Sequence, residues 1–192
     1  MQRPLTLALL LSTALAPAAL AEAADAGPRT EDIIVTGNTT AATKTETPLI
    51  EIPQSVTLID ARRLEDRRPQ TLNQALAYTP GVNVGNYGFD TRYDAFFIRG
   101  FQATYTGVFR DGLRQLNSPS GLFRNEPYGL EGLTVVRGPA SVLYGASGAG
   151  GLVDVRSKRP TDAPFYEVEG IIGNHDRYQV NADLSGPLTA NG

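Results

Sequence analysis

The sequence predicts an α/β fold, in which a small mixed sheet with short helices and long loops is followed by an antiparallel hairpin. Short β-branched runs and short helical patterns follow one another between residues 50 and 160. Pairs such as Pro80-Gly81 and Gly138-Pro139 interrupt these patterns, as expected where loops begin. After residue 160 apolar and polar residues alternate, which is typical of strands with one apolar face.

The predicted strands of the domain are short. Segment 50–60 is extended, but Pro53 confines it to a sheet edge or a turn, because proline has no amide hydrogen to donate. Long polar and aromatic loops separate the other strands. These strands are predicted within 82–84, 95–101, 104–115, 130–138 and 150–158.

Three short helical segments are expected between the strands. Asp60 is a capping residue for the first of them, and Thr71 with Gln74 forms a capping-box pattern at the start of the second. Pro139 stands at the favoured first position of the third. The corresponding segments are 61–68, 71–81 and 139–145.

The composition excludes several classes of site. Lys and Arg number 17 against 20 Asp and Glu, a net charge of −3 that does not favour a nucleic-acid partner. Cysteine is absent and His175 is the single histidine, which argues against thiolate or histidine metal sites and against a catalytic triad. No nucleophile–base pair or paired-acid motif is evident. We therefore expect no enzyme, no catalytic residue and no metal held by protein ligands.

Segment 145–151 concentrates four glycines and superficially resembles a phosphate-binding loop. Its spacing, G-x-x-G-x-G-G, fits neither a Walker loop nor a dinucleotide-binding loop. Leu152 and Val153 follow Gly151, so that no lysine or hydroxyl stands at the phosphate end. We interpret the segment as a tight crossing, where glycine lets the chain pass close to other backbone.

The first 21 residues have the pattern of a secretory signal peptide. Arg3 precedes an apolar run over 5–15, and Ala19-Leu20-Ala21 fits a cleavage site. A membrane anchor is the alternative, but the run is shorter than the roughly 20 residues that a span needs. Cleavage after Ala21 is therefore expected, and the protein would be exported.

The polar segment 22–49 contains one short β-prone run, EDIIVTG at 31–37. An isolated strand in a flexible leader is suited to adding to the edge of a partner's sheet. The alternative is an ordinary first strand of the domain, and the pattern alone leaves both open.

The last segment predicts a hairpin with one apolar and one polar face. Tyr178, Val180, Ala182 and Leu184 alternate with polar residues, and 166–173 alternates more loosely. Strands that face lipid on one side and a wet interior on the other have this period and length. Packing against a soluble core is the alternative.

Several blocks occur in a fixed order along the chain. They are EDIIVTG, TPLIEIPQSVTLIDARRLEDRRPQTLNQALAYTPGV, FFIRGF, DGLR, PYGLEGLTVVRGPASVLYGASGAGGLVDVRSKRPT and a hairpin ending in SGPL. In this order they resemble TonB-dependent outer-membrane receptors, and their ferric-siderophore branch in particular. The first block resembles a TonB box, the middle blocks resemble a plug domain, and the hairpin resembles the first strands of the barrel.

The resemblance divides the chain into four segments. It implies a signal peptide at 1–21, a flexible leader at 22–49 with the TonB box at 31–37, a plug domain at 50–160, and the start of a truncated transmembrane β-barrel at 161–192. The implied fold is therefore a small mixed-sheet plug domain followed by the first antiparallel hairpin of that barrel.

The resemblance also implies a function. The protein would take up ferric siderophore across the bacterial outer membrane, with TonB and its inner-membrane energising complex as partners and membrane lipid around the barrel. The plug and leader would face the periplasm, and iron would arrive coordinated by the siderophore, so that no cofactor is expected. Receptors for cobalamin or saccharides, and a stand-alone periplasmic plug-like binding module, are the alternatives.

Site residues follow from the matched positions. Arg99 and Arg137 match arginines that pair with barrel glutamates, whereas the alternative is pairing within the plug, for example with Glu131. TonB would bind Asp32, Ile33, Ile34, Val35 and Thr36. The candidate ligand residues, on three loops, are Tyr87, Arg92, Tyr93, Gln102, Tyr105, Phe123 and Arg124.

Overall fold

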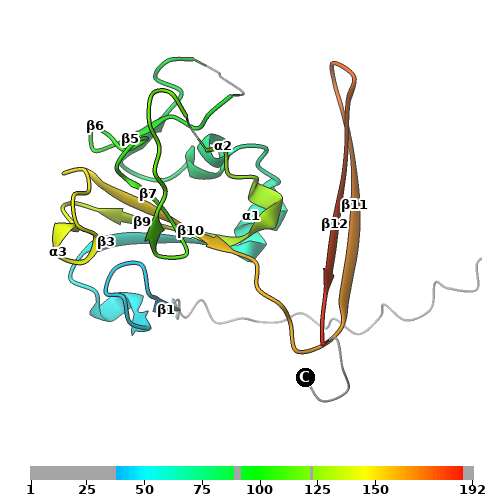
Figure 1. The fold of residues 1–192 in the computed structure, drawn as a ribbon, viewed down its shortest axis with the longest axis horizontal. Coiled ribbons are helices and arrows are strands. Elements are labelled where there is room, and N and C mark those ends of the chain that lie inside the picture. The colour runs from blue at the N-terminus through cyan, green and yellow to red at the C-terminus, as the bar shows by residue number, and fades with distance from the viewer. Residues whose placement is uncertain (1–37, 89–91, 122, 188–192) are drawn as a thin grey trace, which may run out of the picture. The chain divides into compact units, whose positions relative to one another are not determined.

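The structure is a computed structural model that describes residues 38–88, 92–121 and 123–187 (Figure 1). Its largest sheet consists of β3 (Ser55–Asp60), β7 (Val108–Arg110), β8 (Leu113–Arg114), β9 (Leu130–Arg137) and β10 (Gly151–Ser157). Their order across the sheet is β3-β9-β10-β7-β8. Only β7 and β10 pair in parallel, so the sheet is mixed. The predicted α/β fold with a small mixed sheet is confirmed.

Smaller sheets and short helices complete the fold. One sheet pairs β4 (Val82–Val84), β5 (Phe96–Ile98) and β6 (Phe101–Gln102), and a second pairs β1 (Asn38–Thr39) with β2 (Thr47–Pro48). The α-helices are α1 (Ala61–Arg67), α2 (Leu72–Leu76) and α3 (Ser141–Tyr144). Two single turns of 3-10 helix are η1 (Leu49–Glu51) and η2 (Pro127–Gly129).

The central strands β9 and β10 are buried on both faces. Val135 and Val153 belong to a first core cluster, which also contains Leu72 and Leu76 of α2. Val136 and Leu152 point to the other face, into a second cluster with Tyr144 of α3. Burial on both sides explains why adjacent residues such as Val135 and Val136, or Leu152 and Val153, are both apolar, where a half-buried strand would alternate.

Both predicted N-cap side chains bind their helices, although the Gln74 side chain accepts from the Gln70 amide at 2.7 Å rather than from Thr71 as a full capping box requires. The Asp60 carboxylate accepts a hydrogen bond from the Arg63 amide at 2.9 Å. The Thr71 hydroxyl accepts one from the Gln74 amide at 3.1 Å. Each satisfies an amide that has no partner inside the first turn of its helix.

Two local predictions were wrong in their bounds, although β3 lies at a sheet edge as Pro53 indicated. Segment 50–60 is extended only from Ser55 onward, because residues 49–51 form a 3-10 turn before Pro53. The third helix begins at Ser141 rather than Pro139, since Ala140 has a non-helical backbone with φ −119° and ψ 21°. Because this helix is only four residues long, it provides no more than one turn against the sheet.

The glycine-rich segment is a backbone crossing. A Cβ at Gly150 would lie 2.1 Å from the Ile98 carbonyl oxygen, and a Cβ at Gly151 would lie 2.1 Å from that of Val136. Gly151 also has φ +136°, which side-chain-bearing residues rarely adopt. The segment therefore passes between β5 and β9 at a distance that only glycine permits.

The last described elements are β11 (Phe165–Gly173) and β12 (Arg177–Ser185), which pair as the predicted antiparallel hairpin. On the apolar face, Val168 and Val180 are 74% and 77% exposed. Among the described residues, no helix is both long and apolar enough to cross a membrane.

Candidate functional site

The candidate ligand residues lie on or beside loops that follow β4, β6 and β8. Tyr87 is exposed and its ring stands 5.9 Å from that of Phe97, while the Arg92 guanidinium lies 5.8 Å from the Tyr93 ring. Gln102 ends β6 and is exposed, and Tyr105 is half-buried. Exposed aromatic and cationic side chains in this arrangement can stack on flat rings and bind anionic oxygens.

Phe123 and Arg124 lie on the third of these loops. Phe123 is exposed, whereas the Arg124 guanidinium donates a hydrogen bond to the Gln70 carbonyl oxygen at 3.2 Å. Arg124 is thus bound to the segment between α1 and α2, a contact that the sequence did not indicate.

The second pair of predicted site residues, Arg99 and Arg137, lies together. A Cβ at Gly81 would lie 3.6 Å from Cδ of Arg137 and 3.9 Å from Cγ of Arg99. Arg99 is exposed, and its backbone is left-handed with φ +51°. Burial, with a smaller contribution from the Arg99 charge, lowers the pKa of Arg137.

Arg137 is hydrogen-bonded within the domain, but only to neutral oxygens. It donates to the Pro80 carbonyl at 2.6 Å, to the Ser55 hydroxyl at 3.0 Å and to the Thr57 hydroxyl at 2.6 Å. The suggested partner Glu131 instead lies 3.7 Å from Arg156, since Glu131 and Arg137 stand near opposite ends of β9. Arg137 thus has partners within the domain, as that alternative proposed, but Glu131 is not one of them.

The predicted TonB box, with Asp32, Ile33, Ile34, Val35 and Thr36, lies outside the described residues. The segment that follows it is packed on the domain. Ala41 and Ala42 are buried in the second core cluster, and the Ala41 carbonyl accepts a hydrogen bond from the Tyr144 hydroxyl at 2.6 Å. The leader is thus attached to the sheet within a few residues of the predicted box.

Lys44 lines the same surface pocket as the buried acid Asp154. Its ammonium is 3.6 Å from the centre of the Tyr144 ring and donates to the Gly112 carbonyl at 2.9 Å. The Asp154 carboxylate accepts from the Gly112 amide at 2.9 Å. Burial raises the pKa of Asp154, against smaller opposing effects of that hydrogen bond and of Lys44.

Replacing Asp154 with asparagine is expected to change how stability depends on pH. Because the pKa of Asp154 is raised in the folded state, the folded chain binds its proton more tightly than the unfolded chain does. Wild-type stability should therefore fall as the pH rises from the ordinary value of 3.8 through the raised one. The stability of D154N relative to wild type should rise over the same interval, as measured by urea unfolding at a series of pH values.

The control for this experiment is Asp162→Asn, which neutralises an exposed carboxylate. Its stability should run parallel to that of wild type at every pH. Parallel curves for D154N as well would show that burial does not disfavour the Asp154 charge.

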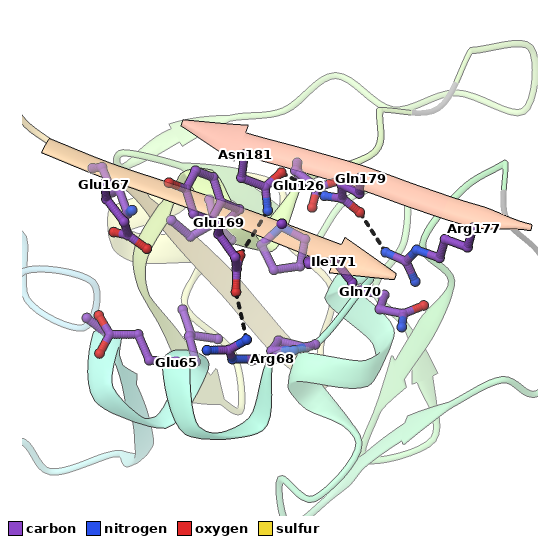
Figure 2. Close-up of a pocket in the computed structure, with 18 of the residues that line it drawn as sticks. Glu65, Arg68, Gln70, Glu126, Glu167, Glu169, Ile171, Arg177, Gln179 and Asn181 are labelled. Atoms are coloured by element: carbon purple, nitrogen blue, oxygen red, sulfur yellow. Dashed lines mark hydrogen bonds and ion pairs between the residues drawn. The ribbon is translucent and has the colours of Figure 1, made fainter. Parts of the chain in front are cut away.

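The polar face of the hairpin meets α1 across a cavity of about 380 Å³ (Figure 2). The Arg68 guanidinium lies 3.0 Å from the Glu169 carboxylate, and Asn181 donates to the same carboxylate at 3.0 Å. Lys158 lies 2.8 Å from Asp183, with its ammonium 4.3 Å from the centre of the Tyr128 ring. The hairpin thus turns its charged residues toward the domain and its apolar residues away from it.

These domain–hairpin ion pairs were not predicted. The alternation of residues 166–185 indicated that Glu169 and Asp183 share a polar face, but not what they face. Arg68 has a left-handed backbone with φ +42° just after α1, which directs its side chain in a way that the helical pattern does not reveal. Within the described residues no group of three or more His, Asp or Glu side chains could hold a metal ion.

The mixed sheet, the glycine crossing within it and the two-faced hairpin that follows are the features predicted for the plug and first strands of a TonB-dependent receptor. Residues 48–152 match the family model of the TonB-dependent receptor plug domain, and the chain belongs to this family. The predicted family is therefore confirmed.

Relatives give the comparison more detail. The ferrichrome outer membrane transporter/phage receptor of Escherichia coli is 40% identical over 159 residues, covering 78% of this chain and 20% of the relative. The ferrioxamine B receptor of Salmonella typhimurium is 38% identical over 190 residues, which cover 96% of this chain and 27% of the relative. The chain thus spans about a fifth to a quarter of the length of these relatives, which are named as receptors and transporters rather than enzymes.

Solved structures show the same fold. The ferripyoverdine receptor of the outer membrane of Pseudomonas aeruginosa, solved with ferripyoverdine bound, aligns with a TM-score of 0.73 at 27% identity, over 81% of this chain and 21% of that one. The siderophore receptor PiuA from Acinetobacter baumannii aligns with a TM-score of 0.66 at 28% identity, over 78% of this chain and 21% of that one.

Proposed function

We propose that the chain provides the plug of a receptor that takes up ferric siderophores across the bacterial outer membrane, driven by TonB. The observation that carries the proposal is the match of residues 48–152 to the plug-domain family. Relatives named for ferrichrome and ferrioxamine B favour an iron chelate over cobalamin or a saccharide as the substrate. The role is transport rather than enzymatic catalysis.

The division of the chain supports this role. Residues 1–21 would direct export, 22–49 would form the leader, 50–160 the plug, and 161–192 the start of the barrel. The apolar face of the hairpin is exposed, while its charged face contacts the plug. This arrangement favours contact between the apolar face and outer-membrane lipid. A stand-alone periplasmic module would leave this apolar face in water, at a cost in free energy.

Arg99 and Arg137 would face acidic residues of the barrel wall. Two adjacent guanidinium groups without a described carboxylate partner repel each other, so an acid placed beside them would stabilise the pair. Arg99, which is exposed, would make this contact directly, while Arg137 would hold the surface in shape through its three hydrogen bonds.

The siderophore would bind at the loops that carry the predicted aromatic and cationic residues. Tyr87, Arg92 and Tyr93 would act from the first loop, and Gln102 and Tyr105 from the second. Phe123 and Arg124 would act from the third. The siderophore itself would coordinate the iron, so that neither a protein metal ligand nor a resident cofactor is needed.

The periplasmic end would carry the TonB contact. Residues 32–36 would pair as a strand with TonB, and the plug and leader would face the periplasm. The packing of Ala41 and Ala42 against the sheet would join this strand mechanically to the plug.

The test is substitution of Ile34 by proline in cells that express the gene encoding this chain and lack other receptors for the substrates. Proline removes a backbone donor and breaks strand pairing, so uptake of radioactive iron supplied as ferrichrome or ferrioxamine B should fall about a hundredfold. Ile34→Val, which keeps a β-branched side chain, should retain uptake.

Binding is measured separately from uptake. Ile34→Pro cells should bind as much iron chelate at their surface as wild-type cells do. Undiminished uptake by the proline variant would exclude strand pairing with TonB, and uptake of neither chelate by wild type would exclude these two substrates.

A further inference from the structure

Five polar side chains join the bases of the three loops that carry the candidate ligand residues. The loops are 85–95 between β4 and β5, 103–107 between β6 and β7, and 115–126 between β8 and η2. We call the five side chains the loop-base network. They are Asp94, Thr104, Gln115, Asn117 and Asn125.

The third loop is bound to the first through Asn125. Its amide donates to the Asp94 carboxylate at 3.4 Å, and both residues are buried. Backbone amides of Leu72 and Asn73, at the start of α2, also donate to Asp94. Asp94 thus connects the first loop, the third loop and a helix of the main core.

Asn125 is also bound within its own loop. Its carboxamide exchanges two hydrogen bonds with that of Gln115, at 3.2 and 3.5 Å, and its side chain is 2% exposed. This amide pair closes the base of the third loop, because the two residues lie at its opposite ends. A partly buried amide pair of this kind fixes geometry, because the buried Asn125 carboxamide would lose these hydrogen bonds without Gln115.

The third loop is bound to the second through Asn117. Its side-chain amide donates to the Thr104 carbonyl at 2.8 Å, and its side-chain oxygen accepts from the Phe123 amide at 3.1 Å. The Thr104 hydroxyl in turn accepts from the Phe96 amide at 3.2 Å, where the first loop ends. All three loops are therefore joined through side chains of the third.

Each member of the network except Gln115 lies next to a candidate ligand residue or bonds one. Asp94 follows Tyr93, Thr104 precedes Tyr105, and Asn125 follows Arg124. Asn117 holds the backbone of Phe123 directly. Asp94, Thr104 and Asn125 are buried, so their neighbours can face outward from fixed backbone positions.

We propose that Asn117 and Asn125 are positioning residues, which set the spacing of the three loops and thereby the affinity for the iron chelate. The identity of the ligand rests on the proposed function. The coupling of the three loops does not depend on it. Small displacements matter here, because a chelate bound by several loops at once loses contacts when one loop shifts.

Coupling is tested without ligand, by hydrogen exchange on the chain. Asn117→Ala should speed amide exchange in the second loop, 103–107, about tenfold, although this loop is not adjacent to residue 117 in sequence. Asn117→Asp should do the same, because a carboxylate still accepts from Phe123 but cannot donate to Thr104. Asn125→Ala should speed exchange at the ends of the third loop.

The matched control is Tyr144→Phe, which removes a buried hydrogen bond in the second core cluster, away from the loops. It should leave exchange at 103–107 as in wild type. If Asn117→Ala leaves exchange at 103–107 unchanged, or if Tyr144→Phe raises it equally, the network does not couple the loops and the proposal is overturned.

Affinity is tested by the concentration dependence of iron uptake with ferrichrome and ferrioxamine B as probes. Asn117→Ala and Asn125→Ala should raise the half-saturating concentration about tenfold and leave the maximal rate unchanged. Tyr144→Phe should change neither. An equal rise in all three variants would assign the network a merely structural role. Wild-type cells that take up neither probe would exclude these two substrates, and the exchange experiment would still decide whether the loops are coupled.

Discussion

Alanine at Gly151 is expected to destabilise the plug by more than about 3 kcal/mol, or to prevent its folding. Its Cβ would lie 2.1 Å from the Val136 carbonyl oxygen, and φ of +136° is strained for any L side chain. Val136 cannot move away, because it is fully buried near the end of β9 and pairs with β3 on one side and β10 on the other. Urea unfolding of the purified chain, followed by circular dichroism, measures the loss.

Gly150→Ala should be comparably destabilising, since its Cβ would lie 2.1 Å from the Ile98 carbonyl oxygen. Gly148→Ala, in the same segment, is the matched control. Its Cβ would meet Thr106 at an ordinary 3.5 Å, so the cost should stay below about 1 kcal/mol. Equal stability of all three variants would contradict a close backbone crossing.

Methionine at Arg137 is expected to cost about 2–4 kcal/mol of stability. It keeps the unbranched apolar stem but removes three hydrogen bonds to Pro80, Ser55 and Thr57. The substitution also removes a buried charge and its repulsion from Arg99, and both changes favour the folded state. We expect this gain to be smaller than the loss of the three hydrogen bonds. The measurement is again urea unfolding, with the midpoint and slope both recorded.

Arg99→Met supplies the comparison for Arg137. Arg99 is exposed and has no carboxylate partner among the described residues, so its removal should change stability by less than about 0.5 kcal/mol. If Arg137→Met leaves the chain as stable as wild type, the prediction is wrong. The three hydrogen bonds would then only offset the free-energy cost of burying the guanidinium.

Features that depend on neighbours in sequence could be predicted. Asp60 and Thr71 cap their helices as their local patterns indicated, because a capping side chain reaches an amide only three residues away. The two-faced hairpin followed from alternation, since successive side chains of a strand point to opposite sides. The fold class as a whole followed from such local patterns and from the resemblance.

Features that depend on strand register could not be predicted. Arg137 bonds Ser55 and Thr57 because β3 lies beside β9, about eighty residues away in sequence. The pairing of Arg68 with Glu169 joins two elements a hundred residues apart, and the alternation of the hairpin gave no partner for its polar face. The loop-base network likewise needs three loops placed in space before its amides can meet.

The order of strands across the main sheet has a consequence for when the plug can form. Strands β9 and β10 occupy the centre, whereas β3 and β7 flank them and come earlier in the chain. In an emerging polypeptide that has reached only residue 129, β3 would have no partner strand in this sheet and β7 could pair only with the short β8. Such distant pairings slow folding. The chain should therefore stay largely unstructured until Ser157 is available, a property that would suit the proposed export if the polypeptide crosses the membrane in an extended form.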